Sequence, residues 1–179
     1  MAEVVVKRLK FIDESGIHLS LTRLFGRAAP GQRVADDVPQ RPGGPSWTLL
    51  GALGLGGLSA AWVLDGPVDG VAFEIYVRHV LGPTLKPGDI VVMDNLSAHK
   101  VSAIKSAITA QGAHLHFLPP YSPDLNPVEQ CWSKIKTALR AAKARTFEAL
   151  LEALKVALQT VTKQDAIAWF IQCGYCVDA

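Results

Sequence analysis

The sequence has few cysteines, and this shortage limits what the protein can be. Only three occur among the 179 residues, at positions 131, 173 and 176. That number is small and odd, so it does not predict a disulfide framework, and a reducing compartment is expected. Cys173 and Cys176 form a lone C-x-x-C. Without a second pair of ligands, this spacing does not predict a zinc site.

Net charge and targeting signals are also scarce. The formal net charge is only +2, which neither requires nor excludes a nucleic-acid partner, so any basic surface must come from local clustering. No signal peptide is visible, because Lys7, Arg8 and Lys10 lead into "FIDESG" rather than an apolar segment. The length predicts a single domain over residues 1–179, large enough to bury a core.

Charged residues are absent from residues 42–64, a run long enough to span a bilayer. Glycines interrupt this run, and Gly56-Gly57 divides it into "WTLLGALGL" and "LSAAWVL". Two apolar strands joined by a Gly-Gly turn explain the pattern better than a membrane helix does. We therefore expect a buried hairpin and no membrane partner.

The remaining pattern predicts a mixed α/β domain in which strands come early and helices fill in later. "VVVKRLKFIDES" is expected to form a strand ending near Asp13, and "GDIVVMDN" and "AHLHFLPP" predict two more strands. Helices are expected over "VDGVAFEIYVRHVLGPTL", ended by Gly82-Pro83, and over "SAHKVSAIKSAITAQG". Three further helices are predicted at about residues 127–144, 147–160 and 164–172. The Gly-, Pro- and Arg-rich segment between Leu21 and Pro45 predicts a long irregular connection.

Three acids stand at the boundaries of these elements. Asp13 and Asp94 each follow an apolar strand, and Glu129 stands at the beginning of a helix. In open α/β sheets, functional groups gather beside the ends of strands. Carboxylates from separate segments are the ligands that a pair of hard divalent cations needs, so these acids are candidates for a metal site.

Each acid also has a simpler structural explanation. An Asp at a strand end is usually a turn or cap residue. Glu129 has a specific alternative, because Asn126 as N-cap and Pro127 as first helical residue would make Asn-x-x-Glu a capping box. Considered one at a time, the acids do not decide between these interpretations.

Three strings resemble the catalytic domain of DDE transposases of the mariner-like superfamily, specifically its bacterial insertion-sequence branch. They are "FIDESG", "VVMDNLSAHK" and "FLPPYSPDLNPVEQCWSKIK". Thirty-four residues lie between Asp94 and Glu129, the interval typical of the second and third acids in that superfamily. The resemblance extends from about residue 8 to 160. It implies an RNase H-like fold, in which a mixed sheet flanked by helices carries two acids and a helix after the last strand carries the third.

The resemblance also implies roles for individual residues. The catalytic, metal-binding acids would be Asp13, Asp94 and Glu129. Residues that support the metal site or contact the substrate would be Asn95, His99 and Asn126. Asp124 belongs to a structural turn in the family, and Glu14 is expected to point to the opposite face of the strand from Asp13. Mg²⁺ is the implied cofactor, with Mn²⁺ as a substitute, and two ions are expected once DNA is bound.

A basic face is predicted on the helix that starts at residue 127. Offsets of three and four place Glu129, Ser133, Lys136, Arg140 and Lys143 on one face. The opposite face is expected to be core: Val128, Cys131, Trp132, Ile135, Leu139 and Ala142. An ordinary solvated face would explain the basic stripe too, but beside a metal-binding acid it favours contact with phosphates.

Arginines in the irregular connection form a second basic cluster, which would clamp DNA or a partner subunit. They are Arg23, Arg27, Arg33 and Arg41. The residues expected to bind DNA from all segments are Arg27, Arg33, Lys100, Lys136, Arg140 and Lys143.

By resemblance, the expected activity is metal-dependent cleavage of DNA at transposon ends, followed by transfer of the freed 3′-hydroxyl to target DNA. The implied partners are both DNAs, a second copy of the chain in a homodimer, and a separate helix-turn-helix polypeptide, since no such region precedes Asp13. A bacterial cytoplasmic location at the nucleoid is also implied. Two alternatives stay open: another RNase H-like nuclease, and a non-catalytic DNA or protein interaction module descended from a transposase.

Overall fold

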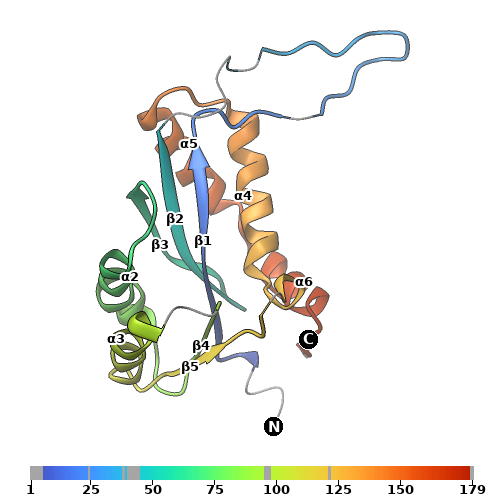
Figure 1. Cartoon of the computed structure of the whole chain (residues 1–179). Helices are drawn as coiled ribbons and strands as arrows, with labels where there is room; N and C mark the ends of the chain where they lie inside the picture. Colours follow the sequence, from blue (N-terminus) through green and yellow to red (C-terminus); the bar gives the residue numbers. More distant parts are fainter. Residues whose placement is uncertain are drawn as a thin grey trace.

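A five-stranded sheet lies at the centre of the molecule, with helices on both faces (Figure 1). The computed structural model describes residues 6–23, 25–37, 39, 45–94, 98–120 and 122–177, and only the backbone of residues 98–101. The strand order is β3-β2-β1-β4-β5. In the part of the chain so described, no helix is long and apolar enough to cross a membrane.

The first three strands form an antiparallel ladder. β1 (Leu9–His18) pairs with β2 (Ser46–Gly54), and β2 pairs with β3 (Gly57–Asp65). The predicted hairpin is therefore confirmed, with its turn at residues 55 and 56. Gly57, the first residue of β3, adopts a positive φ of 111°, which favours glycine. The prediction that both strands are buried is wrong for β3, which is half-exposed because it lies at the sheet edge.

β1 does not end near Asp13 as predicted but continues to His18. The continuation has a physical basis, because Ser15 and Ile17 are buried and the ladder with β2 runs on to the His18–Ser46 pair. Asp13 therefore lies within the strand, where the pleat fixes the direction of its side chain.

The other two strands run parallel to β1. β4 (Ile90–Met93) pairs with β1, and β5 (His114–Phe117) forms the second edge of the sheet. Parallel neighbours need crossover connections, and α3 (Ala98–Thr109) supplies the one between β4 and β5. This order confirms the predicted mixed α/β class.

One layer of helices covers the sheet face that includes Ile12, Leu50 and Val91. It contains α2 (Gly70–Tyr76) and α3. The helical path from α2 continues as a π-helical segment, Val77–Leu81, and a 3-10 turn, Gly82–Thr84. The prediction of one helix that ends at Gly82-Pro83 is therefore only partly right: the α-helix ends at Tyr76, and the helical path includes Gly82 and Pro83 and ends at Thr84.

Three helices cover the opposite face: α4 (Val128–Ala142), α5 (Phe147–Gln159) and α6 (Lys163–Gln172). They pack on a core that includes Phe11, Leu49, Val92, Leu139 and Phe170. All three helices were predicted within one or two residues. Ala142 is exposed rather than core, because α4 ends there and Lys143 turns into the left-handed region.

Candidate metal-dependent nuclease site

Asp13 points to the α4 side of the sheet. Alternate residues of a strand face opposite sides, and Leu9, Phe11 and Ile17 all belong to the core beneath α4, α5 and α6. Asp13 shares their parity, so its carboxyl group leaves the sheet on that face. Glu14 has the opposite parity and is exposed.

Asp94 lies beside Asp13 at the end of β4. Phe11 pairs with Val92 in the parallel ladder, and each aspartate stands two residues beyond one member of this pair. Val92 belongs to the core on the α4 side, and Asp94 shares its parity. The two aspartates therefore occupy corresponding levels of adjacent strands on one face.

Glu129 reaches the same place from the first turn of α4. The chain enters this helix through a 3-10 turn, Pro123–Leu125, and then Asn126, which is extended at φ −105° and ψ 96°. Asn126 Oδ1 accepts a hydrogen bond from Val128 N at 3.4 Å. The prediction that Asn126 is the N-cap is off by one residue, because α4 has Pro127 at that position and no side chain caps it there. Tyr175 Oη donates to Leu125 O at 2.9 Å and holds the turn from the other side.

The alternative capping role of Glu129 is not fulfilled. Asn126 N, the amide that a capping box would direct to the Glu129 carboxylate, donates instead to Pro123 O at 3.0 Å. Glu129 is exposed, and its carboxylate is available for another partner.

Asn126 also joins the helix entry to the first acid. Its side chain is buried, and Nδ2 donates to Asp13 Oδ2 at 3.4 Å. On the other carboxylate oxygen, Asp13 Oδ1 accepts from Glu14 N at 2.8 Å. The residue predicted to support the site is thus in direct contact with an acid of the predicted triad.

The charges of Asp94 and Glu129 both affect the carboxyl group of Asp13. The pKa of Asp13 is raised from 3.8 to about 7, mainly by burial and in addition by the negative charges of Glu129 and Asp94. The Glu14 backbone N–H and the Trp132 indole N–H oppose this shift and lower the pKa. A carboxyl group in this environment favours either a proton or a nearby cation.

The donor set fits a hard divalent cation, since all three groups are carboxylates and two are open to solvent. Within the described ranges, however, no group of three or more His, Cys, Asp or Glu side chains is assembled to hold a metal ion by itself. Substrate oxygens or a side-chain adjustment would have to complete the coordination.

The structure describes only some of the other residues that were predicted to belong to the site. Asn95 lies outside the described residues, and so do the side chains of His99 and Lys100, whose backbone forms the start of α3. Asp124 is exposed in the 3-10 turn. Cys173 is buried next to Gln130 and Cys176 is exposed, both with free thiols.

Two of the predicted DNA-binding residues meet at a hollow of about 910 Å³ between the irregular connection and α4. Arg27 lies on its connection side and Arg140 on its helix side, together with Arg23 and Phe25. The connection passes over the C-terminal end of α4 (Figure 1).

The other predicted basic residues that the structure describes do not line this hollow, and Arg41 lies outside the described residues. Arg33 is exposed in the connection, and Lys136 is partly exposed on α4. Lys143 forms an ion pair with Asp36, so it fastens the connection to the end of α4.

Trp132 is the site residue that its sequence pattern did not reveal. Its spacing on α4 predicts a core side chain, and it is 3% exposed, as expected. The only sequence signal for a further role is its position one helical turn after Glu129.

Together, the sheet order and the carboxylates define an α/β domain with an acidic site between two central strands and a helix. A family model described as DDE superfamily endonuclease matches residues 8–151, and the chain belongs to this family. A search of curated proteins gave no match.

Solved structures with the same fold include several of Mos1 transposase. The Mos1 paired-end complex with left transposon end aligns with a TM-score of 0.72 at 17% identity, over 94% of this chain and 52% of that chain. The mariner Mos1 paired-end complex with Mn aligns with a TM-score of 0.69 at 16% identity, over 95% of this chain and 54% of that chain. The catalytic domain of Mos1 mariner transposase aligns with a TM-score of 0.64 at 14% identity, over 94% of this chain and 76% of that chain. This chain spans about half the length of the first two, and the likeness confirms the RNase H-like fold.

Proposed function

We propose that this chain is the catalytic domain of a transposase of the bacterial insertion-sequence branch, which cleaves DNA at transposon ends and joins the 3′-hydroxyl to target DNA. The observation that supports the proposal is the pKa of Asp13, which is raised to about 7 mainly by burial and in addition by the charges of Glu129 and Asp94. Membership of the DDE superfamily endonuclease family supports the same chemistry.

Asp13, Asp94 and Glu129 would hold Mg²⁺, or Mn²⁺ in its place. Two such ions, bound together with DNA, supply activation of the attacking oxygen and charge stabilisation of the leaving oxygen. The chain's own contribution is to position the carboxylates: Glu14 N and Asn126 Nδ2 donate to Asp13, while Asn126 O accepts from Glu129 N at 3.2 Å at the start of α4. The printed descriptions of Mos1 complexes with Mg and with Mn support this choice of ions.

The DNA backbone would approach along α4. Lys136 and Arg140 follow Glu129 on the same helix, and Arg27 faces Arg140 across the hollow. Guanidinium groups suit phosphates because they donate two parallel hydrogen bonds. Arg33 and Lys100 would extend this contact, and Lys143 would add to it where its pair with Asp36 opens.

Partners are proposed on the same basis. Neighbouring structures are described as a paired-end complex and a strand transfer complex of Mos1, which supports transposon-end and target DNA as substrates. A second copy of this chain and a separate helix-turn-helix polypeptide remain proposals, as do supporting roles for Asn95 and His99.

A substrate panel tests the proposal against the two alternatives. The purified chain is incubated with Mn²⁺ and labelled inverted-repeat ends, four-way junctions or RNA/DNA hybrids. Cleavage at the 3′ ends of the inverted repeats, with joining to added target DNA, is the expected result. Preference for junctions or hybrids would identify another RNase H-like nuclease. Metal-independent DNA binding without cleavage of any substrate would identify a non-catalytic module.

A further inference from the structure

Gly51 leaves space for an aromatic ring directly beside Asp13. The two residues are paired across β1 and β2, so they occupy the same face of the sheet. A Cβ atom on Gly51 would lie 2.9 Å from Cη2 of Trp132, which is closer than carbon atoms pack. The indole of Trp132 therefore fills the space that the missing side chain leaves, next to the first acid of the site.

The polar end of this indole has no hydrogen-bond partner. Trp132 is 3% exposed, and across the described ranges no acceptor meets its Nε1 in hydrogen-bonding geometry. A buried donor without a partner costs about 1–3 kcal/mol, so native proteins rarely retain one without a reason. The indole packs against Gly51, the partner of Asp13 in the ladder, so the Asp13 carboxyl group is a neighbouring acceptor on the same face of the sheet.

We propose that Trp132 is a positioning residue whose indole N–H donates to Asp13 when that carboxylate binds a divalent cation. Glu14 N and Asn126 Nδ2 already donate to its two oxygens. A third donor would restrict the carboxylate to one orientation and leave its remaining lone pair for the cation. The inference rests on the proposed function, because it requires Asp13 to be a metal ligand.

The same contact would link two elements of the site. Trp132 is on α4, one turn beyond Glu129, whereas Asp13 is on β1. An indole hydrogen bond would therefore set the spacing between the strand that provides one acid and the helix that provides another.

The first test measures Mn²⁺ binding without DNA by calorimetry. Trp132→Phe removes the N–H and keeps an aromatic ring, and we expect about tenfold weaker Mn²⁺ binding, as for other residues that orient a metal ligand. The control is Trp62→Phe, which removes an indole stacked on Tyr76 on the other side of the sheet and should bind Mn²⁺ as the wild type does. A purely structural role for Trp132 would lower Tm and leave the Mn²⁺ affinity unchanged.

The second test follows the indole itself and does not depend on how well a variant folds. In protein with ¹⁵N-labelled tryptophan, titration with Mg²⁺ should move the Trp132 indole proton downfield, because it gains a charged acceptor. The other three indole signals serve as internal controls. A Trp132 signal that stays in place while Mg²⁺ saturates the site would overturn the inference.

Asp13→Asn separates failure of the inference from failure of the proposed function. If the wild type and Asp13→Asn bind Mn²⁺ equally, or neither binds it, the proposed metal site is wrong and the inference falls with it. If Asp13→Asn loses Mn²⁺ binding but Trp132→Phe retains wild-type affinity, only the role of Trp132 is wrong.

Discussion

Asp13 is held where its charge is unfavourable until something compensates it. Burial, together with the charges of Glu129 and Asp94, raises its pKa to about 7, so near neutral pH the metal-free protein keeps a proton there that the unfolded chain releases. A carboxylate whose ionised form is destabilised in this way is typical of functional sites, which often lower the stability of the folded protein.

Asp13→Asn should therefore stabilise the metal-free protein, and the gain should depend on pH. The folded pKa is raised, so the contribution of Asp13 to wild-type stability is most favourable below about pH 4 and falls as the pH rises toward 7. A shift of this size corresponds to about 4 kcal/mol. Solvent screening at a partly exposed carboxyl reduces the expected gain to about 2 kcal/mol at pH 8. Thermal unfolding in EDTA at pH 4 and pH 8 measures it.

Glu14→Gln is the matched control, because it neutralises the adjacent acid on the opposite face of β1. It should leave the difference in Tm between pH 4 and pH 8 as in the wild type. An Asp13→Asn protein with the same change in Tm at both pH values would contradict the assigned electrostatics.

The three acids were proposed from sequence by resemblance to a family, and their metal-binding role stays a prediction. The role of Trp132 could not be predicted. Its spacing on α4 indicates only a core position. The proposed role depends on the contact of its ring with Gly51, which belongs to a strand far away in the sequence.

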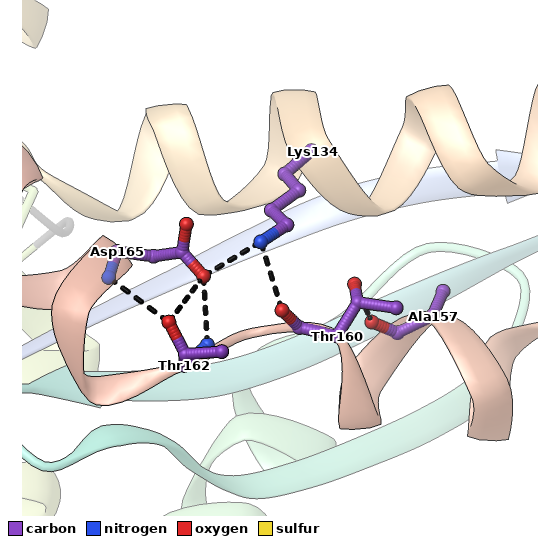
Figure 2. Close-up of polar contacts among 5 residues, drawn as sticks. All are labelled: Lys134, Ala157, Thr160, Thr162 and Asp165. Carbon is purple, nitrogen blue, oxygen red and sulfur yellow. Dashed lines mark hydrogen bonds and ion pairs between the residues drawn. The ribbon is translucent and has the colours of Figure 1, made fainter.

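Lys134 joins three helices at one point (Figure 2). Its Nζ donates to Asp165 Oδ2 at 2.6 Å and to Thr160 O at 2.8 Å, at the C-terminal end of α5. Asp165 also completes a capping box with Thr162 at the start of α6. A cation at a helix C-terminus and an anion at a helix N-terminus both complement the helix dipoles, so this contact fastens α5 and α6 to the helix that holds Glu129.

Asp165→Asn should destabilise the protein at neutral pH. Hydrogen bonds from Lys134 and then Thr162 lower the pKa of Asp165 to about 2. The pKa shift of Asp165 is opposite in sign to that of Asp13. The stabilisation by Asp165 is therefore present above about pH 4 and is lost as the pH falls toward 2. Loss of an N-cap interaction typically costs about 1 kcal/mol, so we expect the free energy of unfolding to fall by about this amount at pH 7, as measured by urea unfolding.

Glu152→Gln is the control for this prediction, because it breaks an exposed ion pair with Lys155 that lies three residues away on α5. Exposed pairs contribute little, so its free energy of unfolding should stay near that of the wild type. If Asp165→Asn costs no more than Glu152→Gln at pH 7, the contact does not fasten the helices as described.

Helices and strands were easier to predict than their ends. α4, α5 and α6 have strong apolar periodicity and were placed within one or two residues. β1 extends beyond its expected end because pairing with β2, a tertiary effect, continues past Asp13. The exposure of Ala142 likewise follows from where α4 ends rather than from its spacing.

At the scale of the whole molecule, basic residues from distant segments gather without a large net charge. The formal charge is +2, yet Arg23, Arg27 and Arg140 line one hollow between the connection and α4. Local clustering of this kind produces a positive field along one face, which is enough to attract a polyanion.

Replacing both Arg27 and Arg140 with Gln should weaken DNA binding to a similar extent for all sequences. Each lost phosphate contact should reduce the slope of log affinity against log salt concentration by about 1. Fluorescence anisotropy with an unrelated duplex, over a range of KCl concentrations, measures both quantities. The physical reason is the release of fewer counterions when fewer phosphates are neutralised.

Lys105→Gln is the control, because it removes one exposed charge from α3 on the other side of the sheet. It should leave the salt slope unchanged. If the double variant binds DNA with wild-type affinity and the wild-type salt slope, the DNA does not contact Arg27 and Arg140.

The order of strands and helices could be predicted because each element has its own periodicity or turn residues. How the connection lies over α4 could not be predicted, since it depends on contacts such as the Lys143–Asp36 ion pair between segments far apart in the sequence.

Metal-dependent nicking of supercoiled plasmid by Asp94→Asn measures most directly whether the three acids form a catalytic site. Asp94 is exposed at the end of β4, so the substitution should leave Tm near the wild-type value while abolishing nicking in Mn²⁺. Asp124→Asn, which neutralises an exposed acid in the turn before Glu129, should nick at the wild-type rate. Nicking by folded Asp94→Asn at the wild-type rate would contradict the proposed site.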